Sequence, residues 1–195
     1  IRDEIRLLAE LGVDAVQIDE PWLASVANPA YLAAEGIVDL DSELESSVAA
    51  INAVVDGLDT VPLSVHVCGH SPTAPGADRG PWKPLLDALG RMNVERFTLA
   101  FAGPNLRGFR VLDDFPADKV IGLGVLDTAT SDIESPGEIV ERVETAMGYV
   151  PPERITLNSD CGFAPSARNR RSLDEVYQRL SAMSRATGLL RERYE

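Results

Sequence analysis

Five short apolar runs, separated by amphipathic segments, constrain the fold of this chain more than any other feature of its sequence. The runs are rich in β-branched residues and nearly continuous in apolar character, which is typical of strands buried on both faces of a parallel sheet. They cover residues 13–19, 63–68, 96–101, 120–126 and 155–158. Alternation of such strands with helices predicts a parallel α/β sheet, either doubly wound or closed into an eight-stranded barrel.

Helical patterns with recognisable ends lie between these runs. Ser42, with Glu45 three residues later, indicates a helix that begins with a capping box. Ser135, Pro136 and Glu138 indicate the start of another helix, with proline at its first position and Gly148 near its end. A last helix is expected at residues 173–190. Its expected buried face consists of Leu173, Val176, Tyr177, Leu180 and Met183.

Five strand–helix units are about five-eighths of a (β/α)8 TIM barrel. The chain opens on Ile1, without an initiator methionine and directly in a helical pattern. We therefore interpret residues 1–195 as the C-terminal portion of a single TIM-barrel catalytic domain, carrying roughly its last five βα units. A barrel without its first strands would be open at its edges.

Composition and charge argue against several classes of function. The net charge is −13, from 31 acidic and 18 basic residues. Such a surface repels phosphate backbones and anionic lipids, so we expect no nucleic-acid and no membrane partner. Two cysteines are too few for a disulfide framework and suit a reduced compartment, so we expect a cytoplasmic protein.

All histidines and cysteines of the chain lie at or just past the ends of two predicted strands. His66, Cys68 and His70 lie in SVHVCGH, and Cys161 lies in LNSDCGF. In parallel α/β folds the carboxyl ends of the strands form the active-site face, and residues two apart on a strand point to the same side. His66, Cys68 and Cys161 are therefore candidate zinc ligands, since three protein ligands with an open fourth position are typical of catalytic zinc. The alternative is that these residues are simply buried strand ends.

Carboxylates occupy the same predicted edge of the sheet. Asp19 and Glu20 end the first strand, Asp127 follows the fourth, and Asp160 follows the fifth. Such groups can hold a substrate ammonium group or cap the next helix. We favour substrate binding for Asp19 and capping or support for Asp127. The candidate catalytic residues are Asp19 and Asp127, and the candidate substrate-binding residues are Asp19, Glu20, Trp22 and Asp160.

Several segments of the chain together resemble one known family in their order and spacing. They are VQIDEP, VHVCG, FAGPN, GLGVLD with the following IESPGEI, and PPERITLNSDCG. Over nearly the whole chain they resemble the catalytic barrel of the cobalamin-independent methionine synthases. The resemblance implies a (β/α)8 barrel that transfers a methyl group from methyltetrahydrofolate, or from a methylated corrinoid protein, to the zinc-bound thiol of homocysteine. By motif, His66, Cys68 and Cys161 match zinc ligands, and Asp19 matches the carboxylate that holds the amino group of homocysteine.

Three positions depart from the pattern of that family. Ala100 stands where the family usually has a glutamate zinc ligand, Ala129 where folate-dependent members carry a histidine, and Ser159 where the pattern has proline. The zinc would then have three protein ligands, or His70 would complete the set. The departures leave two alternatives to methionine synthesis. One is a related zinc enzyme that alkylates another small thiol, as coenzyme M transferases do, and the other is a non-catalytic barrel that binds a small thiol or a partner protein.

Overall fold

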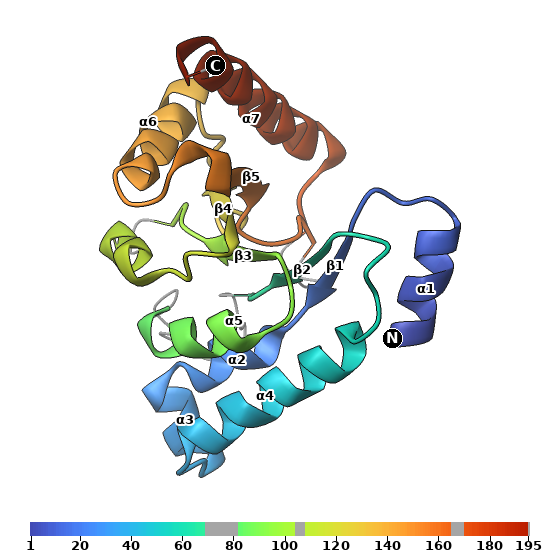
Figure 1. Ribbon diagram of the computed structural model, residues 1–195. Coiled ribbons are helices and arrows are strands. Elements are labelled where there is room, and N and C mark those ends of the chain that lie inside the picture. The colour runs from blue at the N-terminus through green and yellow to red at the C-terminus, as the bar shows by residue number, and fades with distance from the viewer. Residues whose placement is uncertain (69–81, 104–107, 165–169, 195) are drawn as a thin grey trace.

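A computed structural model describes residues 1–68, 82–103, 108–164 and 170–194 of the chain (Figure 1). His70, the predicted alternative ligand, lies outside these residues. Five parallel strands form one sheet, and their order in the sheet is their order in the chain. The strands are β1 (Val16–Asp19), β2 (Leu63–His66), β3 (Arg96–Ala100), β4 (Val120–Leu126) and β5 (Ile155–Ser159).

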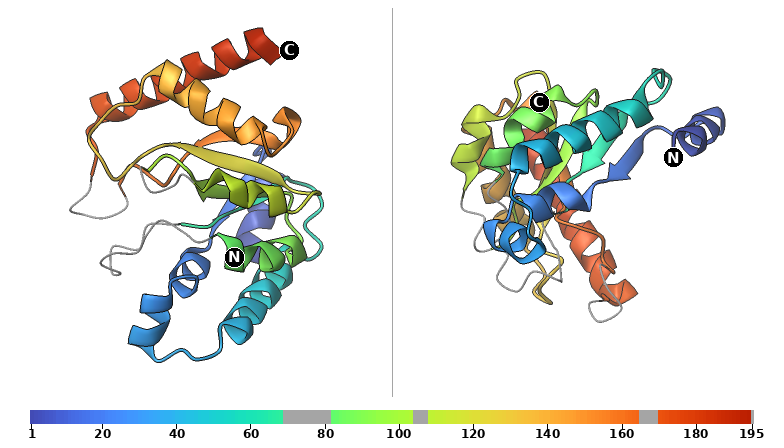
Figure 2. Two further views of the ribbon diagram at one scale, coloured as in Figure 1. Left: turned by 90° about the vertical axis from the view of Figure 1, so that its left-hand side faces the viewer. Right: turned by 90° about the horizontal axis from the view of Figure 1, so that it is seen from below.

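Helices follow one another around the outer side of this sheet (Figures 1 and 2). The α-helices are α1 (Arg2–Glu10), α2 (Pro21–Val26), α3 (Pro29–Glu35), α4 (Leu40–Val55), α5 (Leu86–Arg91), α6 (Pro136–Met147) and α7 (Leu173–Tyr194). Short 3-10 helices are η1 (Lys83–Leu85), η2 (Phe109–Asp114) and η3 (Pro152–Arg154). None of the helices in the described ranges is long and apolar enough to cross a membrane.

The sheet is rolled rather than flat. Strands β2 and β5 are separated by two other strands, so in a flat sheet they would lie about 14 Å apart. The Sγ atoms of Cys68 and Cys161, just past the ends of these two strands, are nevertheless 3.4 Å apart. Gln17 on β1 and Thr98 on β3, which are separated by one strand, share a hydrogen bond of 3.2 Å on the same concave face. A rolled parallel sheet with helices outside is the architecture of part of a (β/α)8 barrel, as predicted.

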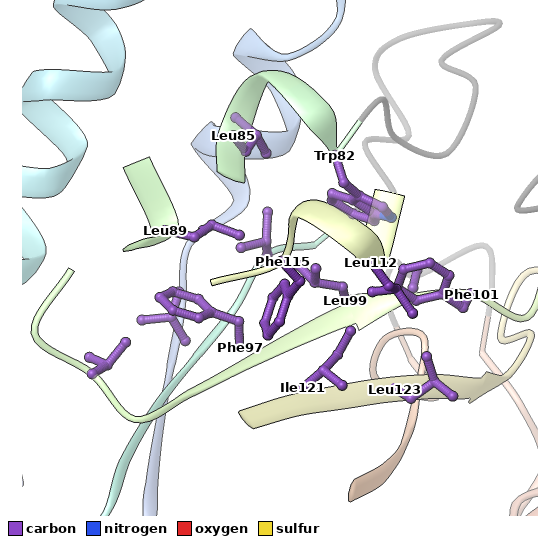
Figure 3. Packing of buried hydrophobic residues seen from close by; sticks show 14 of the residues in the cluster. Trp82, Leu85, Leu89, Phe97, Leu99, Phe101, Leu112, Phe115, Ile121 and Leu123 are labelled. Carbon is purple, nitrogen blue, oxygen red and sulfur yellow. The ribbon is translucent and has the colours of Figure 1, made fainter. Parts of the chain in front are cut away.

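Apolar side chains fill the space between the outer face of the sheet and the helices. The strands β3 and β4 contribute alternate residues to this core, as Figure 3 shows: Phe97, Leu99, Ile121 and Leu123. Gly122 and Gly124, which alternate with these apolar residues along β4, lie on the concave face. A Cβ at Gly122 would lie 2.7 Å from Oγ1 of Thr98, and one at Gly124 would lie 2.3 Å from Oδ1 of Asp160. The two glycines therefore make room for side chains that reach over β4 from neighbouring strands.

The five predicted strands are confirmed, with one shifted start. The first strand begins at Val16 rather than at Val13. Gly12 turns the chain there with a φ of +79°, and the residues from Val13 to Ala15 are exposed before the strand begins to pair. Glycine reaches this left-handed region without the steric cost that a side chain would meet.

One predicted helix start is confirmed and one is wrong. At α6 the reciprocal capping box between Ser135 and Glu138 is present. At α4 the N-cap is Asp39, whose carboxylate accepts a hydrogen bond of 3.0 Å from the backbone N–H of Ser42. Aspartate and serine are comparable N-cap residues. Asp39 lies three residues earlier, so Ser42 falls inside the first turn.

The predicted buried face of α7 is wrong in part: Leu173, Tyr177 and Leu180 are exposed, whereas Val176 and Met183 are partly buried. Leu173 and Tyr177 are 87% and 75% exposed, whereas Arg179 is fully buried. Ala182 and Ala186 are buried as well, and their small side chains let α7 pack closely against α6 and β4. The orientation of α7 is therefore set by a buried arginine and small residues rather than by its largest apolar side chains.

Candidate metal centre

One histidine and two cysteines meet at the carboxyl ends of the strands. His66 is the last residue of β2 and Cys68 lies two residues further on, while Cys161 lies two residues past the end of β5. Their ligand atoms all lie within 4.8 Å of one another. His66 is buried and both thiols are partly exposed, so the cluster is fixed on one side and open on the other.

The geometry of this cluster fits one metal ion. In a tetrahedral zinc site with metal–ligand bonds of about 2.0–2.3 Å, ligand atoms lie about 3.3–3.8 Å apart. The Sγ atoms of Cys68 and Cys161 are 3.4 Å apart, which falls in that range. One imidazole nitrogen and two sulfurs are also the donor types that zinc prefers. These three residues can therefore hold a metal without a change of fold.

The two thiols influence each other strongly. A hydrogen bond between the two sulfurs, together with burial, raises the pKa of the Cys161 thiol. A thiol with a raised pKa stays protonated at neutral pH and is a poor nucleophile. The pair is therefore poorly suited to act as a free nucleophile, whereas a cation held between the two sulfurs would stabilise both as thiolates.

Both ring nitrogens of His66 have an oxygen neighbour. Its Nδ1 lies 3.2 Å from Oδ1 of Asp19, and its Nε2 lies 3.2 Å from the backbone oxygen of Asp160. Histidines that bind metals are usually oriented through the nitrogen that does not bind the ion. The carboxylate of Asp19 is 72% exposed, so it can contact a bound molecule as well as His66.

The polar groups of two other predicted site residues, Glu20 and Trp22, form hydrogen bonds with residues of nearby helices. The carboxylate of Glu20 accepts a hydrogen bond of 2.7 Å from the N–H of Leu23 and caps α2, and burial raises the pKa of this carboxyl. The indole N–H of Trp22 donates to Glu43 at 3.0 Å, and its ring packs edge-on against Tyr31. The indole of Trp22 is thus held between α3 and α4.

Asp127 is a buried loop residue that supports the segment after β4. Its Oδ1 accepts a hydrogen bond of 2.9 Å from the N–H of Ala129, and the side chain of Glu134 accepts one of 2.6 Å from the N–H of Asp127. These contacts hold the loop that follows β4. The carboxylate of Asp160, the last of the predicted site residues, is buried and accepts hydrogen bonds from two backbone N–H groups after β3.

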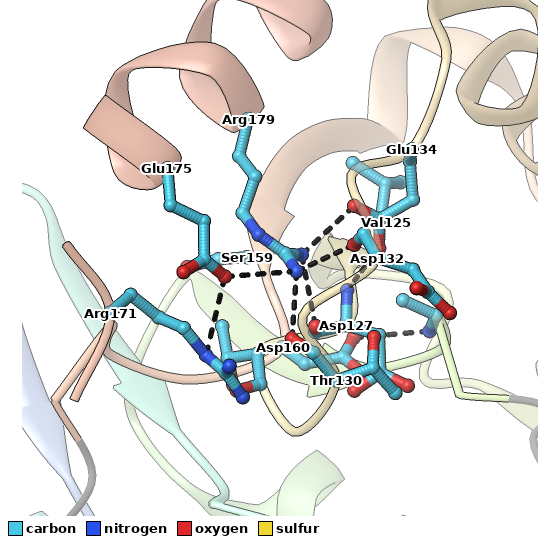
Figure 4. A network of polar contacts seen from close by, with 12 residues as sticks. Val125, Asp127, Thr130, Asp132, Glu134, Ser159, Asp160, Arg171, Glu175 and Arg179 are labelled. Carbon is cyan, nitrogen blue, oxygen red and sulfur yellow. Dashed lines mark hydrogen bonds and ion pairs between the residues drawn. The ribbon is translucent and has the colours of Figure 1, made fainter. Parts of the chain in front are cut away.

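A fully buried arginine on α7, which the sequence analysis did not predict, fixes the same loop. Arg179 donates to the backbone oxygens of Asp127 at 3.0 Å and Thr130 at 2.8 Å, and also to that of Asp132 (Figure 4). It forms ion pairs with Glu134 at 3.0 Å and, within its own helix, with Glu175 at 3.5 Å. The only signal in the sequence was the spacing of Glu175 and Arg179, which is equally typical of an exposed helix surface.

The three positions that depart from the family pattern lie close to this edge. Ala100 ends β3 and is buried, and Ala129 lies in the loop after β4. Ser159 ends β5, and its hydroxyl donates a hydrogen bond of 2.8 Å to the backbone oxygen of Cys161. A proline at this position could not make that contact.

The fold and the cluster together define a class: a parallel βα barrel portion with a histidine–cysteine cluster, of a geometry that can hold a metal ion, at the carboxyl ends of its strands. Residues 1–188 match the model of the cobalamin-independent synthase catalytic domain, and the chain belongs to this family. It spans about half the length of the relatives described next.

Sequence relatives agree with this assignment, and a solved structure agrees with the fold. The chain is 30% identical over 195 residues to a methionine synthase of Pyrococcus horikoshii, covering 100% of this chain and 48% of the relative. It is 27% identical over 192 residues to a methionine synthase of Sulfurisphaera tokodaii, covering 98% and 47%. The structure of a B12-independent methionine synthase from Shewanella sp. W3-18-1, in complex with selenomethionine, matches with a TM-score of 0.74. That match has 21% identity and covers 98% of this chain and 52% of the other, and it supports the fold alone.

Proposed function

We propose that the intact protein transfers a methyl group to the thiol of homocysteine and forms methionine, using zinc held by His66, Cys68 and Cys161. The observation that carries this proposal is the meeting of these three residues at the carboxyl ends of the strands, in a chain of this family. The methyl donor would be methyltetrahydrofolate or a methylated corrinoid protein.

The chemistry requires a thiolate next to the methyl donor. When bound, zinc lowers the pKa of a substrate thiol and keeps it deprotonated at neutral pH. A bond forms between the substrate sulfur and the methyl carbon, while the bond between that carbon and the donor breaks. The donor leaves with the electron pair of the broken bond. His66 and the two cysteines leave one side of the cluster open for the substrate thiol.

Asp19 is the residue we propose to orient the substrate amine. Its carboxylate is largely exposed on the concave face and lies 3.2 Å from the ring of His66, so an ammonium group held there would be close to the cluster. We propose Glu20 and Trp22 as residues that shape the same edge of the site. For Asp127 we propose support of the loop after β4, because its carboxylate already caps that loop.

Ala100 favours one alternative within the same chemistry. It is buried at the end of β3 and supplies no carboxylate where the family pattern has a glutamate ligand. A site with three protein ligands is open to other small thiols, so alkylation of a thiol other than homocysteine is the second candidate function.

The test is the zinc content of the intact protein, together with its activity on different thiols. We expect about one zinc per wild-type chain and a loss of zinc in Cys161→Ser, with methionine formed from homocysteine by the wild type only. Ser181→Ala, on α7, is the control for a substitution that removes no ligand. Zinc with alkylation only of another thiol would favour the second candidate. A wild-type protein that stays free of metal when zinc is supplied would refute both.

A further inference from the structure

We infer that Asp160 is a positioning residue, which fixes Cys161 and His66 in the geometry that binds the metal, and is not a substrate ligand. This inference rests on the proposed metal centre. Asp160 lies between the end of β5 and Cys161, at the point where the chain leaves the sheet.

Asp160 connects the ends of four strands. Its backbone N–H donates to the oxygen of Leu126, at the end of β4, over 2.9 Å. Its Oδ1 accepts hydrogen bonds from the N–H groups of Phe101 at 3.0 Å and Ala102 at 3.1 Å, directly after β3. Its backbone oxygen lies 3.2 Å from Nε2 of His66, which ends β2. A displacement of Asp160 would therefore move a ligand on β2 as well as the adjacent ligand Cys161.

The carboxylate of Asp160 accepts its hydrogen bonds from the protein itself. The residue is 5% exposed, and a buried carboxylate is stable only where hydrogen bonds replace its lost hydration. Bonds from N–H groups to a charged acceptor are stronger than those to a neutral one. The same oxygen receives both backbone N–H groups, so this oxygen is occupied and cannot hold a substrate ammonium group without releasing the loop after β3.

Strand β4, which lies between β3 and β5, has a glycine at the point where this carboxylate crosses it. The side chain of Asp160 reaches over β4 at Gly124, where a Cβ would lie 2.3 Å from Oδ1. The same Cβ would also lie 2.9 Å from the backbone of Ala100 and Leu99. Within the described residues β5 pairs only with β4, so its end is fixed from one side. The link over Gly124 to β3 supplies a second attachment just before Cys161.

The test compares Asp160→Ala and Asp160→Asn in the intact protein loaded with cobalt(II), which reports ligand geometry through its absorption bands. We expect Asp160→Ala to weaken metal binding about 10- to 100-fold, as is typical when support of a ligand is lost, and to shift the cobalt spectrum. Asp160→Asn keeps an acceptor oxygen for both N–H groups, so we expect it to retain the wild-type spectrum and the wild-type KM for the thiol substrate. Asp132→Ala, an exposed aspartate in the loop after β4, is the matched control.

A second measurement is independent of the metal. In metal-free protein we expect Cys161 to be alkylated faster in Asp160→Ala than in the wild type or in Asp132→Ala, as measured by peptide mass spectrometry. An Asp160→Ala protein with wild-type metal affinity, spectrum and alkylation rate would overturn the inference. So would an Asp160→Asn protein with a raised KM and an unchanged spectrum, because that would make Asp160 a substrate ligand. If Asp160→Ala does not fold, the asparagine variant decides alone. A wild-type protein that binds neither zinc nor cobalt would defeat the proposed function, and the alkylation rates would still test the role of Asp160.

Discussion

Replacement of Arg179 by alanine should destabilise the protein more than any other single change on α7. The guanidinium is fully buried and joins three backbone oxygens of the loop after β4 to the carboxylates of Glu134 and Glu175. Removal of one partner from a buried ion pair typically costs about 3–5 kcal/mol, because the remaining charge stays buried without compensation. The carboxylate of Glu134 is only 10% exposed, so water reaches it poorly. We therefore expect the free energy of unfolding to fall by about 3–5 kcal/mol.

The assay is urea unfolding of the intact protein, followed by circular dichroism, with the free energy extrapolated to zero denaturant. The matched control is Arg193→Ala, on the same helix. Arg193 pairs with Glu144, but its side chain is 52% exposed, and exposed pairs contribute about 0–1 kcal/mol. Hydrogen exchange should in addition show faster exchange for the amides of residues 127–134 in Arg179→Ala only. Equal losses of stability in the two variants would refute the reasoning.

Three further predictions concern the glycine on β4, the start of α6 and the metal. Gly124→Ala places a Cβ 2.3 Å from Oδ1 of Asp160 and should lower the free energy of unfolding, measured by thermal unfolding, by about 1–3 kcal/mol. The control is Gly108→Ala, where a Cβ meets nothing within 4 Å, and equal stability of the two variants would contradict this argument. Ser135→Ala should cost about 1 kcal/mol at neutral pH. Hydrogen bonds from Ser135 lower the pKa of Glu138, so the part of this cost that comes from the carboxylate is present above about pH 4.5 and is lost as the pH falls through the lowered pKa, while the N-cap part remains. A cost in urea unfolding that does not decrease as the pH falls below the lowered pKa would contradict the assignment. Chelation of the metal should lower the thermal midpoint, since a ligand that binds only the folded state stabilises it; an unchanged midpoint would argue against a metal bound at this site.

The strands were predictable because each one has a local signature. Val120–Leu126 is apolar and buried almost throughout, as expected for a strand covered on both faces, and its bounds agree with the prediction. The faces of α7 were not predictable in this way. Burial of Arg179 depends on acceptors from residues 127–134, which are distant in the sequence, and a hydrophobicity pattern contains no information about them.

The candidate site was likewise predictable only in part. The spacing of His66 and Cys68 on one strand was sufficient to place both on one side of the sheet. Their meeting with Cys161 depends on how far the sheet rolls, which the residues themselves do not encode locally. The hydrogen bonds of Asp160 could not be foreseen, because the N–H groups that donate to its carboxylate lie directly after β3 and the glycine that it crosses lies on β4.

The order of the strands has a consequence for biosynthesis. Each strand pairs with the one made just before it, so the sheet can grow by short steps as the chain emerges from the ribosome. The metal cluster cannot form in such short steps, because Cys68 and Cys161 are 93 positions apart and follow two strands that do not pair with each other. A nascent chain that ends before β5 presents His66 and Cys68 without their third ligand and should hold the ion only weakly. In the proposed metal centre, uptake of the ion would therefore be a late event, completed only in molecules that have formed β5.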